Sequence, residues 1–287
     1  MRRRTHDLHA RNFHLKLGAD TKIMGIINLT PDSFSRDGQL ARRKSLPAQL
    51  QYALDFIAQG ADILDVGGES TRPGAKPVSA KEESRRIIPL IKALAVQSRV
   101  PISVDTYKMD VAQAALDAGA SIINNIMAIK ATKPFLKMVR DYDAALVLMH
   151  MRGTPQTMQR KTKYKDVVVD VIAELNIVLE KCLEIGIKRD KIIIDPGIGF
   201  AKTPEQNLLL LNRLHEFQAL RCPVLLGTSR KSFIGHVLNK DVRNRLMGSA
   251  ATVSVGICNG AHMVRVHDVN AMKEVARVTD AIVNAYA

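Results

Sequence analysis

The most informative stretch of the chain is Ile192-Ile193-Ile194-Asp195-Pro196-Gly197-Ile198-Gly199-Phe200. Three consecutive β-branched apolar residues are typical of a strand that is buried on both faces, as in a parallel sheet. Pro196 and Gly197 end this strand directly after Asp195. Because α/β proteins bind ligands beyond the C-terminal ends of such strands, Asp195 is a candidate binding residue. Taken alone, it is equally well explained as a turn or helix-capping residue.

The same pattern, an apolar run closed by a polar side chain and a loop, recurs along the chain. We predict strands at Lys22–Asn28, Ile63–Val66, Pro101–Val104, Ser121–Ile123, Ala144–Met149, Ile192–Ile194, Pro223–Leu226 and Met263–Val266. Helical patterns follow them, at about Pro47–Gly60, Ala80–Gln97, up to Ala118, Lys133–Asp141, up to Gly186, Asn207–Leu220, Val242–Asn259 and from Asn270 onward.

This alternation implies parallel strands joined by crossover helices. Eight such units in 287 residues predict an α/β fold, a single-domain (β/α)₈ TIM barrel over residues 22–287, preceded by a lead-in segment, residues 1–21. An open doubly wound sheet is the alternative. It would normally carry a glycine-rich dinucleotide fingerprint after the first strand, and Gly25-Ile26-Ile27-Asn28 does not match one.

Composition limits the class of protein. No run of about 18 apolar residues is present, so we expect no membrane span. The three cysteines lie far apart and form no CxxC pair, which argues against a disulfide framework or a zinc site and favours a reducing cytoplasm. The start, Met1-Arg2-Arg3-Arg4, lacks the apolar segment of a secretory signal. We expect a plain basic tail there rather than an arginine-rich transit segment.

The formal net charge of +14 raises the hypothesis of nucleic-acid binding. The basic residues are scattered, however, aromatic residues make up only 4% of the chain, and there is no tryptophan to stack on bases. We therefore expect small anionic substrates as partners, and neither nucleic acid nor a membrane.

If the barrel forms, polar side chains converge on one rim at the ends of its strands. One group combines acceptors, an amide and a cation, which suits a flat heterocycle with a donor edge: Asp105, Asn124, Asp195 and Lys231. A second group suits phosphate oxygens: Asn28, Arg265 and His267. Each also has an ordinary structural explanation. Asp105 or Asn124 could cap the following helix, His267 could be a histidine with its hydrogen bonds satisfied inside the protein, and Arg265 could be a solvated surface charge. His150 also ends a strand, and we interpret it as structural.

Four stretches resemble the motifs of the dihydropteroate synthase family: Met24-Gly25-Ile26-Ile27-Asn28-Leu29-Thr30-Pro31-Asp32-Ser33-Phe34-Ser35, Asp65-Val66-Gly67-Gly68-Glu69-Ser70-Thr71-Arg72-Pro73-Gly74, Ser229-Arg230-Lys231-Ser232 and Arg265-Val266-His267-Asp268. The resemblance implies a TIM-barrel transferase of folate synthesis. Such enzymes join 6-hydroxymethyl-7,8-dihydropterin diphosphate to 4-aminobenzoate and release diphosphate. They use Mg²⁺, usually form homodimers in the cytoplasm, and are the target of sulfonamides.

The resemblance also implies roles for individual residues. The pterin would be held by Asp105, Asn124, Asp195 and Lys231. Asn28 would help to bind Mg²⁺ and diphosphate. Arg265 and His267 would grip the diphosphate, with Thr71 near it, and with Lys231 they are the predicted catalytic residues. The aminobenzoate site would be shaped by Phe34, Arg72, Pro73 and Ser232.

The chain departs from the family pattern at two places. Arg36 precedes Asp37 where the family usually has Asp-Gly-Gly, and Asn125 stands where the family usually has an aspartate. Two other functions stay open. A methyltransferase that moves a methyl group from a pterin to a corrinoid shares the pterin-type residues, but it has no use for a diphosphate grip such as Arg265-Val266-His267. A non-catalytic basic binding module is the third hypothesis.

Overall fold

The computed structural model describes residues 3–30, 45–72 and 74–285 of the chain. Its main sheet contains eight parallel strands in the order β8-β7-β6-β5-β4-β3-β10-β9. Their bounds are β3 Lys22–Asn28, β4 Ile63–Gly67, β5 Ile102–Asp105, β6 Ile122–Asn125, β7 Ala145–Met149, β8 Ile192–Asp195, β9 Leu225–Leu226 and β10 Met263–Val266. A parallel bridge between Ile194 and Val224 joins β8 to the segment that enters β9, and so closes the sheet on itself. The predicted (β/α)₈ barrel is confirmed.

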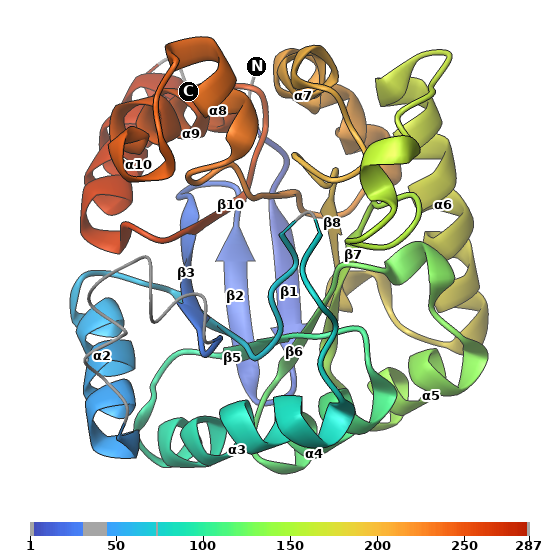
Figure 1. Cartoon of the computed structure of the whole chain (residues 1–287), viewed down its shortest axis with the longest axis vertical. Coiled ribbons are helices and arrows are strands. Elements are labelled where there is room, and N and C mark those ends of the chain that lie inside the picture. The colour runs from blue at the N-terminus through green and yellow to red at the C-terminus, as the bar shows by residue number, and fades with distance from the viewer. Residues whose placement is uncertain (1–2, 31–44, 73, 286–287) are drawn as a thin grey trace.

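Helices surround this barrel (Figure 1). The α-helices are α2 Leu46–Ala58, α3 Ala80–Gln97, α4 Met109–Asp117, α5 Lys133–Asp141, α6 Val167–Ile185, α7 Pro204–Asn212, α8 Ser232–Leu238, α9 Leu246–Cys258 and α10 Val269–Asn284. Short 3₁₀ helices are η1 Ala128–Lys130, η2 Met158–Arg160, η3 Arg189–Lys191, η4 Leu214–Leu220 and η5 Val242–Asn244. None of the helices in the described part of the chain is long and apolar enough to cross a membrane.

Two helix predictions were wrong in detail. The segment predicted as one helix over Asn207–Leu220 is divided into α7 and η4, and α7 begins earlier, at a capping box formed by Thr203 and Gln206. The side chain of Asn259 donates hydrogen bonds to the carbonyls of Leu211 and Asn212, so a contact from α9 takes up the last carbonyls of α7. The predicted helix from Val242 divides into η5 and α9, and α8 precedes both in a stretch for which no helix was predicted.

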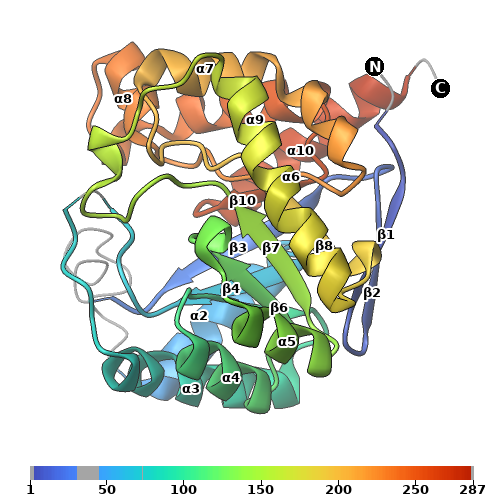
Figure 2. The ribbon, with the colours of Figure 1, turned by 90° about the vertical axis from the view of Figure 1, so that its right-hand side faces the viewer.

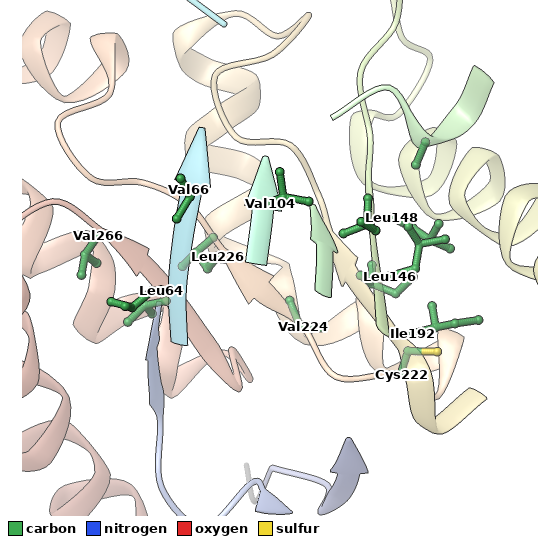
Figure 3. Packing of buried hydrophobic residues seen from close by; sticks show 14 of the residues in the cluster. Leu64, Val66, Val104, Leu146, Leu148, Ile192, Cys222, Val224, Leu226 and Val266 are labelled. Atoms are coloured by element: carbon green, nitrogen blue, oxygen red, sulfur yellow. The ribbon is translucent and has the colours of Figure 1, made fainter. Parts of the chain in front are cut away.

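Side chains alternate along each strand between the barrel interior and the surrounding helices. Toward the N-terminal ends the interior is filled by one apolar cluster that includes Met24, Ile63, Ile122, Ile193, Leu225 and Met263. The intervening residues, such as Leu64, Leu146 and Val266, belong to the larger cluster that packs under the helices (Figure 3). Two residues after the interior apolar positions, the same inward face carries polar groups: Asp65, Asn124, Asp195 and Arg265. The apolar layer therefore supports a polar layer at the C-terminal end of the barrel.

The lead-in segment is structured, which the sequence analysis missed. It forms an antiparallel hairpin of β1 His6–Ala10 and β2 Phe13–Leu17, which lies at one end of the barrel (Figure 2). Leu8, Ala10 and Leu17 are fully or nearly fully buried and belong to the apolar cluster of the barrel interior. Residues 3–21 therefore close the N-terminal end of the barrel.

Candidate functional site

A cavity of about 510 Å³ opens at the C-terminal ends of the strands. It is lined by every predicted site residue that the structure describes: Asn28, Thr71, Arg72, Asp105, Asn124, Asp195, Lys231, Ser232, Arg265 and His267. Phe34, Arg36 and Pro73 lie outside the described residues. The convergence of these side chains from separate strands follows from the barrel, because all parallel strands end at the same rim.

Arg265 is not a solvated surface charge. Its Nε donates to Asp65 Oδ2 over 2.6 Å, and its Nη2 donates to Asp105 Oδ2 over 2.7 Å. The two chemical groups that the sequence suggested, one for a heterocycle and one for phosphate, are thus in direct contact through Arg265 and Asp105. Because a guanidinium has a fixed fork of donors, both carboxylates hold its plane in one orientation.

Asp65 is a functional candidate that the sequence analysis did not single out. It is fully buried on β4, and besides Arg265 it accepts a hydrogen bond from Asn124 Nδ2 over 3.1 Å. It was overlooked because it lies inside an apolar strand rather than at its end. The available signal was its position two residues after Ile63, which puts a charge on the inward face of a barrel strand.

Several buried oxygens at the cavity floor and directly beneath it have no hydrogen-bond donor among the described residues. They are Asp65 Oδ1, Asp105 Oδ1 and Asn124 Oδ1. Buried acceptors are normally satisfied, so those of Asp105 and Asn124, which line the cavity, suit a ligand that brings N–H groups. Burial raises the pKa of Asp105 to about 7, although the neighbouring charge of Arg265 acts in the opposite direction.

Asp195 and Lys231 face this floor from β8 and from the segment before α8. Asp195 Oδ1 accepts a hydrogen bond of 2.7 Å from the backbone N–H of Gly197. The Nζ atom of Lys231 lies 3.9 Å from the centre of the Phe200 ring, which places the cation over an aromatic face. Burial raises the pKa of Asp195, and burial together with the charge of Arg265 lowers the pKa of Lys231 to about 8.

His267 is a neutral group in this site. Burial, followed by the charge of Arg230, lowers the pKa of His267 to about 3. The Oγ atom of Ser229 accepts a hydrogen bond of 3.2 Å from the backbone N–H of His267, and it lies 3.0 Å from the Nδ1 atom of the same residue. If the Ser229 hydroxyl donates to Nδ1, the ring proton lies on Nε2, and His267 can then donate one hydrogen bond to a ligand.

The loop after β4 places Thr71 and Arg72 at the cavity wall. Glu69 anchors this loop, because it accepts hydrogen bonds from Tyr107 Oη over 2.8 Å and from Val78 N over 3.1 Å, and it also pairs with Lys108. The sequence showed Glu69 only as part of a motif. Its partners on the loop after β5 could not be identified before the fold was known.

The unusual Asn125 keeps a local role that an aspartate would also fill. It is buried, and its Oδ1 atom accepts a hydrogen bond of 2.8 Å from the backbone N–H of Met127. Such turns need only one side-chain oxygen two residues before the donor, which an amide supplies as well as a carboxylate does. The substitution therefore removes a charge without removing this hydrogen bond.

The chain is similar to proteins of one family over almost its whole length. A family model described as pterin binding enzyme matches residues 24–267. The dihydropteroate synthase of Synechocystis sp. is 45% identical over 266 residues, which cover 92% of this chain and 91% of the relative. That of Bacillus subtilis is 43% identical over 280 residues, which cover 98% and 95%.

Solved structures of the same family share the fold. Yersinia pestis dihydropteroate synthase in complex with a sulfonamide drug has a TM-score of 0.89 and 38% identity, with 96% of this chain and 98% of that chain covered. The Xanthomonas albilineans enzyme with 4-aminobenzoic acid has a TM-score of 0.87 and 38% identity, with 97% and 98% covered. The chain therefore belongs to the pterin-binding enzyme family, and within it to the dihydropteroate synthases.

Proposed function

We propose that the chain condenses 6-hydroxymethyl-7,8-dihydropterin diphosphate with 4-aminobenzoate to give 7,8-dihydropteroate and diphosphate, as part of folate biosynthesis. The observation that carries this proposal is the floor of the cavity. Buried acceptors of Asp105 and Asn124, which receive no donor from the part of the chain that the structure describes, lie beside the cations Arg265 and Lys231. Such a floor matches a heterocycle with N–H groups that carries an anionic leaving group.

In this proposal the pterin lies against Asp105, Asn124, Asp195 and Lys231. The carboxylates and the amide accept from its N–H groups, and Lys231 donates to its ring acceptors. The amine of aminobenzoate attacks the exocyclic carbon as the carbon–oxygen bond to diphosphate breaks. Diphosphate leaves with the bonding electron pair, and the amine releases one proton. Because the electron-rich ring tolerates positive charge at that carbon, the site needs no strong base.

The leaving diphosphate is assigned to Arg265 and His267, with Thr71 near it. A leaving group gains negative charge in the transition state, so a fixed cation and a neutral N–H donor stabilise it most at that point. The neutral state of His267 suits this role, because it can donate without adding a second charge beside Arg265. Arg72 and Ser232, with Phe34 and Pro73, are assigned to the aminobenzoate.

The proposed Mg²⁺ would be held by Asn28 and by the substrate. No group of three or more His, Cys, Asp or Glu side chains suited to a metal ion occurs within residues 3–30, 45–72 and 74–285. Mg²⁺ commonly keeps several waters and binds through few protein oxygens together with substrate phosphates. The amide oxygen of Asn28, at the cavity wall, fits that donor set. When bound, Mg²⁺ would neutralise charge on the diphosphate.

The direct test is a coupling assay with purified protein, both substrates and Mg²⁺, with release of diphosphate as the measured product. We expect turnover that requires both substrates and that is lost when Mg²⁺ is removed with a chelator. Binding of the pterin without turnover would contradict the synthase proposal and favour a binding module.

Asp195→Asn is expected to weaken pterin binding more than diphosphate binding. The amide can keep its oxygen toward Gly197 N, but it then presents an NH₂ group in place of Oδ2. A buried donor facing a pterin donor is a mismatch of about 1–3 kcal/mol. Calorimetry with each ligand measures the difference. Equal weakening of both ligands would show that Asp195 is not the pterin acceptor.

We also propose a cytoplasmic homodimer. All three cysteines are free, which suits a reducing compartment. The helices α9 and α10 pack on one another and expose the apolar side chains of Met247, Val255, Val278 and Ile282. Exposed apolar groups of this kind are typical of contact surfaces. Sedimentation velocity should show a dimer that Val278→Lys converts to monomer, and an unchanged distribution would argue against this surface.

A further inference from the structure

A chain of polar groups, with Lys202 and His150 buried and Glu174 partly exposed, lies outside the set of residues that line the cavity. Lys202 is 3% exposed and lies between β8 and α7, and its Nζ atom is 3.1 Å from Nδ1 of His150. His150 is fully buried after β7, and its Nε2 atom is 3.0 Å from Glu174 Oε2 on α6. The mechanism proposed above uses none of these residues. A buried lysine requires partners for its charge, so its surroundings show what it holds in place.

Lys202 fixes the turn that joins β8 to α7. Its Nζ atom donates to the carbonyls of Gly197 over 3.0 Å and of Phe200 over 2.9 Å. This turn is tightly built, because a Cβ atom at Gly197 would lie 1.9 Å from the carbonyl oxygen of His150, and Gly197 has φ of 70°. Ala201 also has positive φ, 52°, a conformation that non-glycine residues adopt only when the surroundings impose it.

The same turn contacts two of the proposed pterin-binding residues. The backbone N–H of Gly197 donates to Asp195 Oδ1, and the ring of Phe200 lies under Nζ of Lys231. The carbonyls that Lys202 binds belong to these two residues, Gly197 and Phe200. One ammonium group therefore holds the backbone that orients Asp195 and the ring that supports Lys231.

The hydrogen bonds assign the protons along the chain. In its charged form Lys202 has three donors, no acceptor of its own and three acceptors around it, so Nδ1 of His150 then carries the lone pair. Nε2 of His150 then carries the proton and donates to Glu174, which Arg152 also binds. Glu174 on α6 therefore orients His150, and His150 in turn orients Lys202 at the turn.

We propose that Lys202 is a positioning residue for the pterin-binding end of the site: it holds the turn 197–201 against Asp195 and Lys231, and His150 and Glu174 hold Lys202. This inference rests on the proposed function for the identity of the ligand. It adds residues that touch no substrate to the set on which pterin affinity depends.

The charges around Lys202 support its role as a positioning residue. Burial lowers the pKa of Lys202 to about 7, and the negative charges of Asp195 and Glu174 act against that lowering. In return, the charge of Lys202 acts to lower the pKa of Asp195, which burial raises. The titratable and charged groups that surround Lys202 from the packed elements are His150, Arg152, Tyr164, Glu174, Asp195 and Lys231.

The test compares Lys202→Met with Lys191→Met, a matched control at the other end of the barrel. Lys191 is also buried and pairs with Asp143 over 2.9 Å. Calorimetry uses 6-hydroxymethylpterin and, separately, inorganic diphosphate with Mg²⁺. We expect Lys202→Met to bind the pterin about tenfold more weakly or worse, as loss of a buried hydrogen-bonded anchor predicts, with diphosphate binding changed by less than about twofold. Lys191→Met should leave both affinities near those of the wild type.

The pH dependence separates positioning from a general loss of structure. Without the charge of Lys202 the pKa of Asp195 rises, so more of Asp195 is protonated at mildly acidic pH. The part of the acid limb of pterin binding that Asp195 sets then moves to higher pH, in addition to the part set by Asp105, whose pKa lies at about 7. General loosening would weaken binding equally at all pH values. Glu174→Gln should weaken pterin binding by a smaller factor than Lys202→Met does. Its effect should be largest above neutral pH, because without the negative charge of Glu174 the pKa of Lys202 falls below about 7 and its charge is lost there.

The outcomes are distinct. The inference is overturned if Lys202→Met binds the pterin like the wild type and the acid limb of its pterin binding does not move. If Lys202→Met does not fold, Glu174→Gln decides, and pterin binding equal to that of the wild type at both acidic and alkaline pH overturns the inference. Wild-type protein that does not bind the pterin at all refutes the proposed function, and the inference with it.

Discussion

Arg265→Ala is expected to reduce turnover by about 10²-fold or more, by analogy with loss of a preorganised group that stabilises developing charge. The variant removes the cation assigned to the leaving diphosphate. It also leaves Asp65 and Asp105 facing each other without the guanidinium that now contacts both. The KM for aminobenzoate should change less, because that substrate is assigned to other residues, Arg72 and Ser232 among them.

The same variant should have a second, separable effect. Arg265 acts to lower the pKa of Asp105, which nevertheless lies at about 7, so its removal raises that pKa further. At neutral pH Asp105 would then be largely protonated and would no longer accept from the pterin. Raising the pH deprotonates Asp105 and so restores its acceptor, but it does not replace the cation of Arg265. We therefore expect partial recovery of pterin binding at higher pH without recovery of turnover.

Stability must be measured alongside the kinetics. Removing one partner of a buried ion pair typically costs about 3–5 kcal/mol. A raised folded-state pKa of Asp105 means that this carboxyl favours the folded state at low pH and that the contribution is lost as pH rises through that pKa. Thermal melts of Arg265→Ala should accordingly show a larger loss of stability at pH 8 than at pH 5.

Arg213→Ala is the matched control. Arg213 also bridges two carboxylates, Glu216 over 2.5 Å and Asp166 over 2.7 Å, and it does not line the cavity. Its loss should leave turnover nearly normal. Arg265→Lys keeps the charge without the fork and should lie between the wild type and Arg265→Ala. A folded Arg265→Ala protein with near-normal turnover would refute the leaving-group assignment.

The fold could be predicted because the apolar runs in the sequence match the order of strands in a parallel barrel. Runs such as Ile192–Ile194 predict buried strands, and the polar residue that closes each run marks the rim. The hairpin was missed although Leu8 and Ala10 alternate with polar residues, because short alternation is a weak signal without knowledge of what the strand covers. The helix α8 was missed because it has only seven residues and begins inside the motif Ser229-Arg230-Lys231-Ser232, which leaves too short a segment for a helical period to be recognised.

The residues that make up the site could be predicted from the sequence, but which of their side chains contact one another could not. Arg265 binds carboxylates 160 and 200 positions away in sequence, and neither contact has a local signature. The roles of His150 and Lys202 depend in the same way on three elements meeting behind the rim. Polar residues at strand ends are visible in sequence, whereas residues that hold them are found only when the packing is known.

Asp65→Ala is expected to reduce kcat/KM for the pterin diphosphate by about 10²-fold, although Asp65 is not among the residues that line the cavity. It is the shared acceptor for Arg265 Nε and Asn124 Nδ2, so the variant releases a cation and an amide at once. Two lost hydrogen bonds of about 1–1.5 kcal/mol each correspond to roughly this factor. Steady-state kinetics measures it, with Asp62→Ala, directly before the same strand, as the control that should retain activity.

Asp65→Asn tests the negative charge of Asp65 separately from its hydrogen bonds. Asp65 Oδ1 has no hydrogen-bond partner among the described residues, so the new NH₂ group can take its place while the amide oxygen still accepts from Arg265 and Asn124. We expect this variant to lose less than about tenfold in kcat/KM. The charge of Asp65 acts to raise the pKa of Asp105, so its removal lowers that pKa from about 7. The acid limb of kcat/KM, which reports groups of the free enzyme, should therefore move to lower pH. An acid limb at the wild-type position, or an Asp65→Ala enzyme within twofold of wild type, would show that Asp65 only fills space beneath the site.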